Sequence, residues 1–161
     1  MSFYTTVILL FLLSPSIVTA AAPSAYEVLE GFHFPEGLLP KGVISYELDR
    51  SSGKFRIDFN TSCSFSLEGS YQLRYQSSIT GFISDGRLTE LRGISVKVLF
   101  FWLNILEVNR IDDDLEFSVG VASASFSLDN FFVSPQCGCG LDCNDIRIRK
   151  LNLGNPSLSS V

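Results

Sequence analysis

Histidine is almost absent from this sequence, and the motifs that usually accompany hydrolytic catalysis are missing. The chain has one histidine, His33, which lies between two phenylalanines. It contains no G-x-S-x-G nucleophile elbow and no metalloprotease helix motif. A serine nucleophile needs a base within hydrogen-bonding reach, so His33 is the one weak catalytic candidate, and partial burial in an apolar turn is its simpler interpretation. Glu107 and Glu116 are a conceivable acid–base pair, but solvent exposure is the default expectation for both.

Basic side chains are also scarce: 12 Lys and Arg stand against 17 Asp and Glu, which gives a formal net charge of −5 at pH 7. Binding of nucleic acids requires a concentrated basic face, and anionic membrane surfaces attract clustered Lys and Arg for the same reason. The basic residues here are scattered along the chain. We therefore expect no nucleic-acid partner and no attraction to anionic membranes. We expect no cofactor either.

The N-terminal stretch up to Ala22 has no charged side chain. It contains the apolar run Val7–Leu13 and ends in small residues, which is the pattern that signal peptidase accepts. Residues 1–20 are therefore predicted to be a signal peptide cleaved after Ala20, with cleavage after Ala22 as the alternative. An uncleaved anchor is the other interpretation, although Pro15 interrupts the stretch. No second long apolar run follows, so the mature domain is predicted to be secreted and not to span a membrane.

Four cysteines follow this stretch: Cys63, Cys137, Cys139 and Cys143. In an exported chain they are expected to form disulfides. A bridge between Cys137 and Cys139 would fit disulfide geometry badly. Two pairings remain: Cys63 with Cys137 and Cys139 with Cys143, or Cys63 with Cys139 and Cys137 with Cys143. A zinc site is the alternative, but zinc ligands usually come as two closely spaced pairs, so no metal is expected.

Asn60 begins the sequence Asn60-Thr61-Ser62, which is an N-glycosylation sequon. It is the predicted glycosylation site, and a glycan there requires that Asn60 face solvent.

Alternation of apolar and polar residues dominates the chain after Gly42. Phe55–Phe59 and Leu115–Val121 show it most clearly, and Asp85-Gly86 is a strong hairpin turn. About eight to ten short strands at regular spacing predict an all-β fold. We expect a closed or nearly closed antiparallel β-barrel over residues 21–144, with a sandwich as the alternative. A capping box, Ser24 to Glu27, predicts a short N-terminal helix, and residues 145–161 are expected to form a flexible tail.

One apolar run, VKVLFFWLNILEV from Val96 to Val108, has apolar residues on both faces and is predicted to be a strand. Its densest part contains Phe100, Phe101 and Trp102, which cannot all point into the main core. These three are the predicted ligand-binding residues, at a lipid-contacting mouth. The alternative is that the N-terminal helix and the segment Phe32–Leu39 cover them.

Several short segments carry a resemblance to a known family. They are Tyr26–Leu29, Gly37–Val43, Ile105–Val108, Phe117–Ser127 and Cys137–Cys139, and together they resemble the plant family called domain of unknown function 538. The resemblance runs from about Ala25 to Cys143. It implies an all-β barrel often associated with stress, with a suggested kinship in shape to lipid-binding proteins of the bactericidal permeability-increasing type. Hydrolysis of ester-bearing pigments has been suggested for members, and no agreed catalytic residues can be carried over.

Three functions follow from these observations. The first is a secreted carrier of an apolar ligand, either lipid or pigment, with a stress- or wall-related role in the apoplast. The second is a non-catalytic protein of the cell wall that binds another protein or a glycan. The third is a weak esterase for apolar esters. The fourteen phenylalanines favour the first, because they provide apolar volume without hydrogen-bonding demands.

Overall fold

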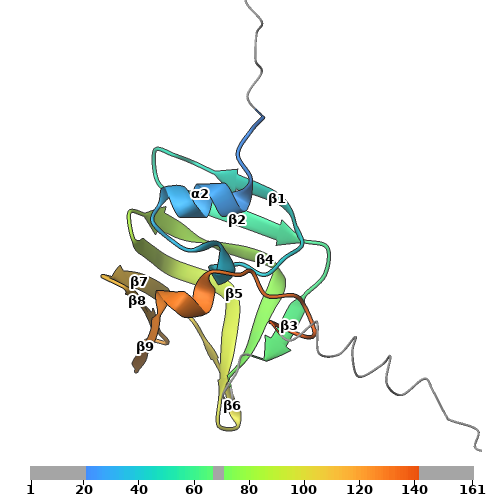
Figure 1. The fold of residues 1–161 in the computed structure, drawn as a ribbon, viewed down its shortest axis with the longest axis vertical. Coiled ribbons are helices and arrows are strands. Elements are labelled where there is room, and N and C mark those ends of the chain that lie inside the picture. The colour runs from blue at the N-terminus through green and yellow to red at the C-terminus, as the bar shows by residue number, and fades with distance from the viewer. Residues whose placement is uncertain (1–20, 67–70, 142–161) are drawn as a thin grey trace, which may run out of the picture.

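The structure, a computed structural model, describes residues 21–66 and 71–141. The predicted signal peptide at 1–20, Cys143 and the predicted tail at 145–161 lie outside the described residues. The described chain is mostly β-strand with one short α-helix, as the alternating pattern predicted (Figure 1). In chain order the elements are α2 (Ala25–Gly31), η1 (Glu36–Leu38), β1 (Val43–Leu48), β2 (Lys54–Phe59), β3 (Cys63–Ser66), β4 (Gln72–Ser84), β5 (Arg87–Val98), β6 (Phe101–Asn104), β7 (Glu107–Ile111), β8 (Asp114–Ser118), β9 (Ser123–Ser127) and η2 (Leu128–Phe131).

The two longest strands, β4 and β5, are antiparallel and pair with different neighbours along their lengths. Near one end, β2 joins β4 and β7 joins β5, which extends the sheet to the order β1-β2-β4-β5-β7-β8-β9. Near the other end, β3 pairs with the beginning of β4 and β6 pairs with the end of β5. The hairpin that contains β6 lies at the end of the molecule opposite α2 (Figure 1).

A broken register and a glycine bend the two long strands near their midpoints. The pairing of β4 with β5 shifts on both sides of Thr80, and bulges of this kind bend a strand and increase its twist. Gly93 lies at the bend with a φ of 93°, and a Cβ there would come 2.5 Å from the carbonyl oxygen of Ser78. Glycine is the residue that accommodates both conditions. The sheet therefore curls around the face that carries the core.

The curled sheet is not closed, and the predicted β-barrel is not supported. β1 and β9 are the two ends of the strand order, and no hydrogen-bonded ladder joins them among the described residues. Distant parts of the sheet contact each other through side chains instead. The ring of Tyr71, just before β4, packs edge-on against that of Phe126 in β9, with 5.5 Å between centroids. Alternation in the sequence identifies strands and their buried faces but does not specify whether the outermost strands pair.

The N-terminal helix packs on the curled sheet through its buried residues Ala25 and Leu29. The predicted capping box is confirmed: the Ser24 hydroxyl accepts from the Glu27 N–H, and the Glu27 carboxylate accepts from the Ser24 N–H. α2, η1 and η2 lie across the same face of the sheet (Figure 1). The core therefore lies between this layer and the sheet.

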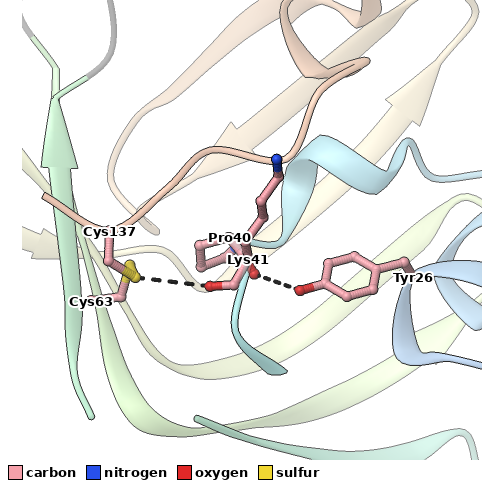
Figure 2. Close-up of a disulfide and its surroundings, with 5 residues drawn as sticks. All are labelled: Tyr26, Pro40, Lys41, Cys63 and Cys137. Carbon is pink, nitrogen blue, oxygen red and sulfur yellow. Dashed lines mark hydrogen bonds between the residues drawn. A yellow bond between two sulfur atoms is a disulfide. The ribbon is translucent and has the colours of Figure 1, made fainter. Parts of the chain in front are cut away.

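The segment after η2 is tied back to the beginning of the sheet. Cys137 forms a disulfide with Cys63 of β3 (Figure 2), which is the bridge of the first predicted pairing. Next to it, the N–H of Gly138 donates to the carbonyl of Ser64 at 2.7 Å. Cys139 is also disulfide-bonded. The described cysteines are thus oxidised, as the prediction of disulfides requires.

A turn divides the apolar run that the sequence predicted to be one strand. β5 ends at Val98 and β6 begins at Phe101, which leaves Leu99 and Phe100 as a two-residue hairpin turn. Leu99 has a φ of 55°. Turns of this kind usually contain Gly, Asn or Asp at positions of positive φ, so the sequence carries no ordinary signal for this one.

Candidate ligand-binding cavity

The curled sheet and the segments packed on it enclose a cavity of about 580 Å³. Its lining comes from α2, η1, η2 and strands on both sides of the bend. Most of the lining side chains are aliphatic or aromatic. They include Leu29, Leu38, Phe55, Leu73, Ile94, Val96, Leu103, Phe117 and Phe126. A volume in this range, with predominantly apolar walls, is typical of a small-molecule site.

Two of the three tyrosine hydroxyls of the lining, those of Tyr46 and Tyr75, are already used by the fold. Tyr75 is buried and its hydroxyl donates to the carbonyl of Leu38 at 2.9 Å. Burial raises the pKa of Tyr75, which keeps this hydroxyl neutral. The hydroxyl of Tyr46 donates to the carbonyl of Pro23 at 2.6 Å. These groups hold η1 and the start of the described chain in place, and the walls they contribute to the cavity are aromatic rings.

The charged side chains and the amide of the cavity lining are exposed to solvent. The charged side chains of the lining are Glu47 and Asp129, which are both acidic and exposed. Asn130 is an exposed polar residue of the same lining, whereas the hydroxyl of the lining residue Ser123 donates to Glu116. The site therefore combines a deep apolar wall with a rim that offers hydrogen bonds and no positive charge. Such a rim orients an uncharged polar group and disfavours an anionic one.

The predicted ligand-binding residues Phe100, Phe101 and Trp102 do not line this cavity. They lie on the β5–β6 hairpin with 87%, 69% and 36% of their surfaces exposed, respectively. Their neighbours Val98 and Leu103 do belong to the lining. The alternative that the N-terminal helix covers the three residues is wrong, because the hairpin and α2 lie at opposite ends of the molecule (Figure 1).

His33 lies in the turn after α2, with a φ of 63° and 67% of its side chain exposed. The interpretation of His33 as a partly buried packing residue is therefore wrong, because its neighbour Phe34 occupies the core position. The ring Nδ1 contacts the carboxylate of Asp85, and the backbone carbonyl accepts from Arg110 at 2.7 Å. No serine or cysteine of the described chain bonds the ring, and His33 does not belong to the lining of the apolar cavity.

The two acidic candidates, Glu107 and Glu116, lie on the paired strands β7 and β8. Glu107 forms a 3.5 Å ion pair with Arg87, and Glu116 accepts from the Ser123 hydroxyl at 3.3 Å. Neither lines the cavity. The predicted glycosylation site Asn60 is exposed between β2 and β3, and its modification remains a prediction.

Residues 21–66 and 71–141 contain no group of three or more His, Cys, Asp or Glu arranged to hold a metal ion. Within the same residues, none of the helices has the length and apolar character needed to cross a membrane.

Sequence reasoning located the aromatic cluster but not the cavity. The lining residues are the inward members of the alternating strands, so the pattern did identify the face to which they belong. The empty volume depends on the bend at Gly93 and on how far the helical layer stands from the sheet. No pattern in the sequence predicts the size of this bend or the distance between the helical layer and the sheet.

Comparison with known proteins identifies the family. The model of the family described as "Protein of unknown function, DUF538" matches residues 25–132. An uncharacterized protein of Arabidopsis thaliana, At5g01610, is 25% identical over 95 residues, which cover 59% of this chain and 55% of that protein. The chain thus spans about half the length of the curated relative it matches. Because the family match extends from α2 to just beyond η2, over more than half of the sequence, the chain belongs to the DUF538 family.

Proposed function

We propose that this protein binds one small apolar ligand, a lipid or a pigment, in the cavity of the curled sheet. The observation that carries the proposal is the cavity itself, with its volume of about 580 Å³ and its predominantly apolar lining. Transfer of an apolar ligand from water to such walls gains about 25 cal/mol for each Å² of apolar surface buried. Binding of this kind needs no catalytic residue, which suits a site from which His33 is absent.

The rim narrows the chemistry of the ligand. Its charged side chains, Glu47 and Asp129, are acidic, so a carboxylate at the mouth would meet charges of its own sign. An alcohol, ester or amide can instead accept or donate hydrogen bonds at the amide of Asn130. We therefore propose a ligand with an uncharged polar end rather than a free fatty acid.

The proposed place of action is outside the cell, in the apoplast or wall. The disulfide between Cys63 and Cys137 supports it, because such bridges persist in oxidising compartments. The uncharged apolar stretch at residues 1–20 supports it as well. N-terminal sequencing of the protein recovered from culture medium tests both, since export with cleavage predicts a mature chain that begins at Ala21.

A pair of variants on one strand tests the cavity. On β9, Ala124 lies opposite Phe117 and belongs to the lining, whereas Ser125 lies opposite Glu116 on the other face. Ala124→Trp places an indole in the cavity, and Ser125→Trp places the same ring in solvent. Binding of a fluorescent fatty alcohol ester should be lost in the first variant and retained in the second. Equal binding by both variants, or no binding by the wild-type protein, contradicts the proposal.

A further inference from the structure

The hairpin between β5 and β6 ends in a run of exposed apolar side chains. We define residues Val98–Trp102 as the hairpin tip. Leu99 and Phe100 are 82% and 87% exposed, and Phe101 is 69% exposed. Single exposed apolar residues are ordinary on a protein surface, but a contiguous group marks a contact site.

The register of the hairpin places apolar side chains on both faces of the tip. Phe101 pairs with Val98, on the face of the cavity-lining Leu103, whereas Trp102 pairs with Lys97 on the opposite face. Leu99 and Phe100 form the turn between them. The tip is therefore a projecting apolar knob rather than the wall of a groove.

Folding alone gives no reason for these residues. The turn holds Leu99 at a φ of 55°, a conformation that costs an L-residue other than glycine about 1–2 kcal/mol. Glycine followed by a polar residue would form a two-residue turn without that cost and without exposing apolar surface. Strain combined with exposure points to a contact that the described chain does not itself supply.

The described charged side chains around the tip are of one sign. Among the described residues of β3, the first part of β4 (72–75), the last part of β5 (94–98) and β6, the charged side chains are Arg74 and Lys97. The guanidinium of Arg74 lies over the ring of Trp102, 4.0 Å from its centroid. Lys97 is paired with Trp102 across the hairpin. A local cationic pair beside an apolar knob thus occurs in a chain whose net charge is −5.

We propose that the hairpin tip inserts into the surface of a phospholipid bilayer. Leu99, Phe100 and Phe101 enter the acyl region, Trp102 lies at the headgroup level that its amphipathic ring prefers, and Arg74 and Lys97 contact lipid phosphates. A fluid lipid surface accommodates a knob with apolar side chains on both faces, whereas a protein partner would need a matching groove. Charges more than about 8 Å away are screened in physiological salt, and among the described residues the pair of Arg74 and Lys97 is the charge nearest the tip.

This insertion does not require an occupied cavity. It places the cavity-lining Val98 and Leu103 next to the lipid surface, which would give an apolar ligand a route that avoids water. The two proposals are nevertheless separable. Ala124→Trp, which fills the cavity, should leave membrane binding unchanged.

Trp102 is the one tryptophan of the sequence and reports directly on the tip. With phosphatidylcholine vesicles, we expect the wild-type protein to co-float, its emission to shift to the blue, and brominated lipid to quench it. The double variant Leu99→Gly/Phe100→Asn keeps a favoured turn and should bind at least about tenfold more weakly, because it loses two apolar side chains from the bilayer. With vesicles that also contain an anionic phospholipid, Lys97→Ala should bind up to about fivefold more weakly.

Phe132→Ser is the matched control, because Phe132 is 62% exposed outside the tip. It should bind vesicles as the wild-type protein does. The proposal is overturned if wild-type Trp102 emission is unchanged by vesicles, or if the double variant and the control bind equally well. It is also overturned if the wild-type protein ignores vesicles but forms oligomers that the double variant lacks, since the tip would then contact a second copy of the chain.

Discussion

The bridge between Cys63 and Cys137 should be the largest single covalent contribution to stability in the described part of the fold. It links β3 to the segment after η2 across a sequence separation of 74 residues (Figure 2). Restricting an unfolded loop of that length stabilises the folded state by about 4 kcal/mol in the chain-entropy model. The free energy of unfolding of a natural domain is about 5–15 kcal/mol. The double variant Cys63→Ala/Cys137→Ala should therefore lose a large fraction of it.

Urea unfolding followed by circular dichroism measures this loss. With a denaturant slope of about 2 kcal/mol/M, the midpoint should fall by about 2 M. The slope itself should increase, because the unfolded chain without the bridge exposes more surface. Native hydrogen bonds such as that from Gly138 to Ser64 remain available to the variant, so folding should still occur. A midpoint shift below about 0.5 M with an unchanged slope would contradict this prediction, because the disulfide would then not restrict the unfolded chain.

Three further predictions concern single residues. Burial raises the pKa of Tyr75 above its unfolded value of about 10. The free energy of unfolding should therefore fall as the pH rises above 10, by up to about 1.4 kcal/mol per pH unit. In urea titrations at successive pH values, Tyr75→Phe should remove this dependence on pH. Gly93→Ala should lower the free energy of unfolding by about 3 kcal/mol, because a Cβ would meet a backbone oxygen at 2.5 Å. Gly42 also has a positive φ but open space around it, so Gly42→Ala should lower the free energy of unfolding by about 1 kcal/mol. Thermal unfolding measures both. Hydrogen bonds, first from the Ser51 hydroxyl, lower the pKa of Asp49 to about 2, and NMR titration should find this value in the wild-type protein and a higher one in Ser51→Ala.

Local signals in the sequence predicted local structure well. The capping box at Ser24 and Glu27 and the turn at Asp85-Gly86 are both present, because each depends on residues only a few positions apart. The strand ending at Phe59 has its alternate residues buried, as the pattern indicated. These features follow from backbone chemistry that neighbouring side chains determine.

Features that depend on distant contacts were not predictable. The turn at Leu99 and Phe100 contradicts turn preference, and the alternation that begins at Leu115 continues to Val121 although β8 ends at Ser118 and a turn containing Gly120 follows. Closure of the sheet was inferred from strand number, but pairing between edges depends on bends such as that at Gly93. For the same reason the aromatic run was assigned to a cavity mouth, whereas the structure places it on a projecting hairpin.

Native mass spectrometry of the protein recovered from plant cells, followed by organic extraction, tests the apolar cavity most directly. A cavity that holds a ligand should give a species heavier than the chain by one small ligand, or should form that species after incubation with a plant lipid extract. The extracted ligand should have an apolar body and an uncharged polar end. An unliganded mass that persists after incubation with the extract would contradict the central claim that the curled sheet encloses a ligand-binding site.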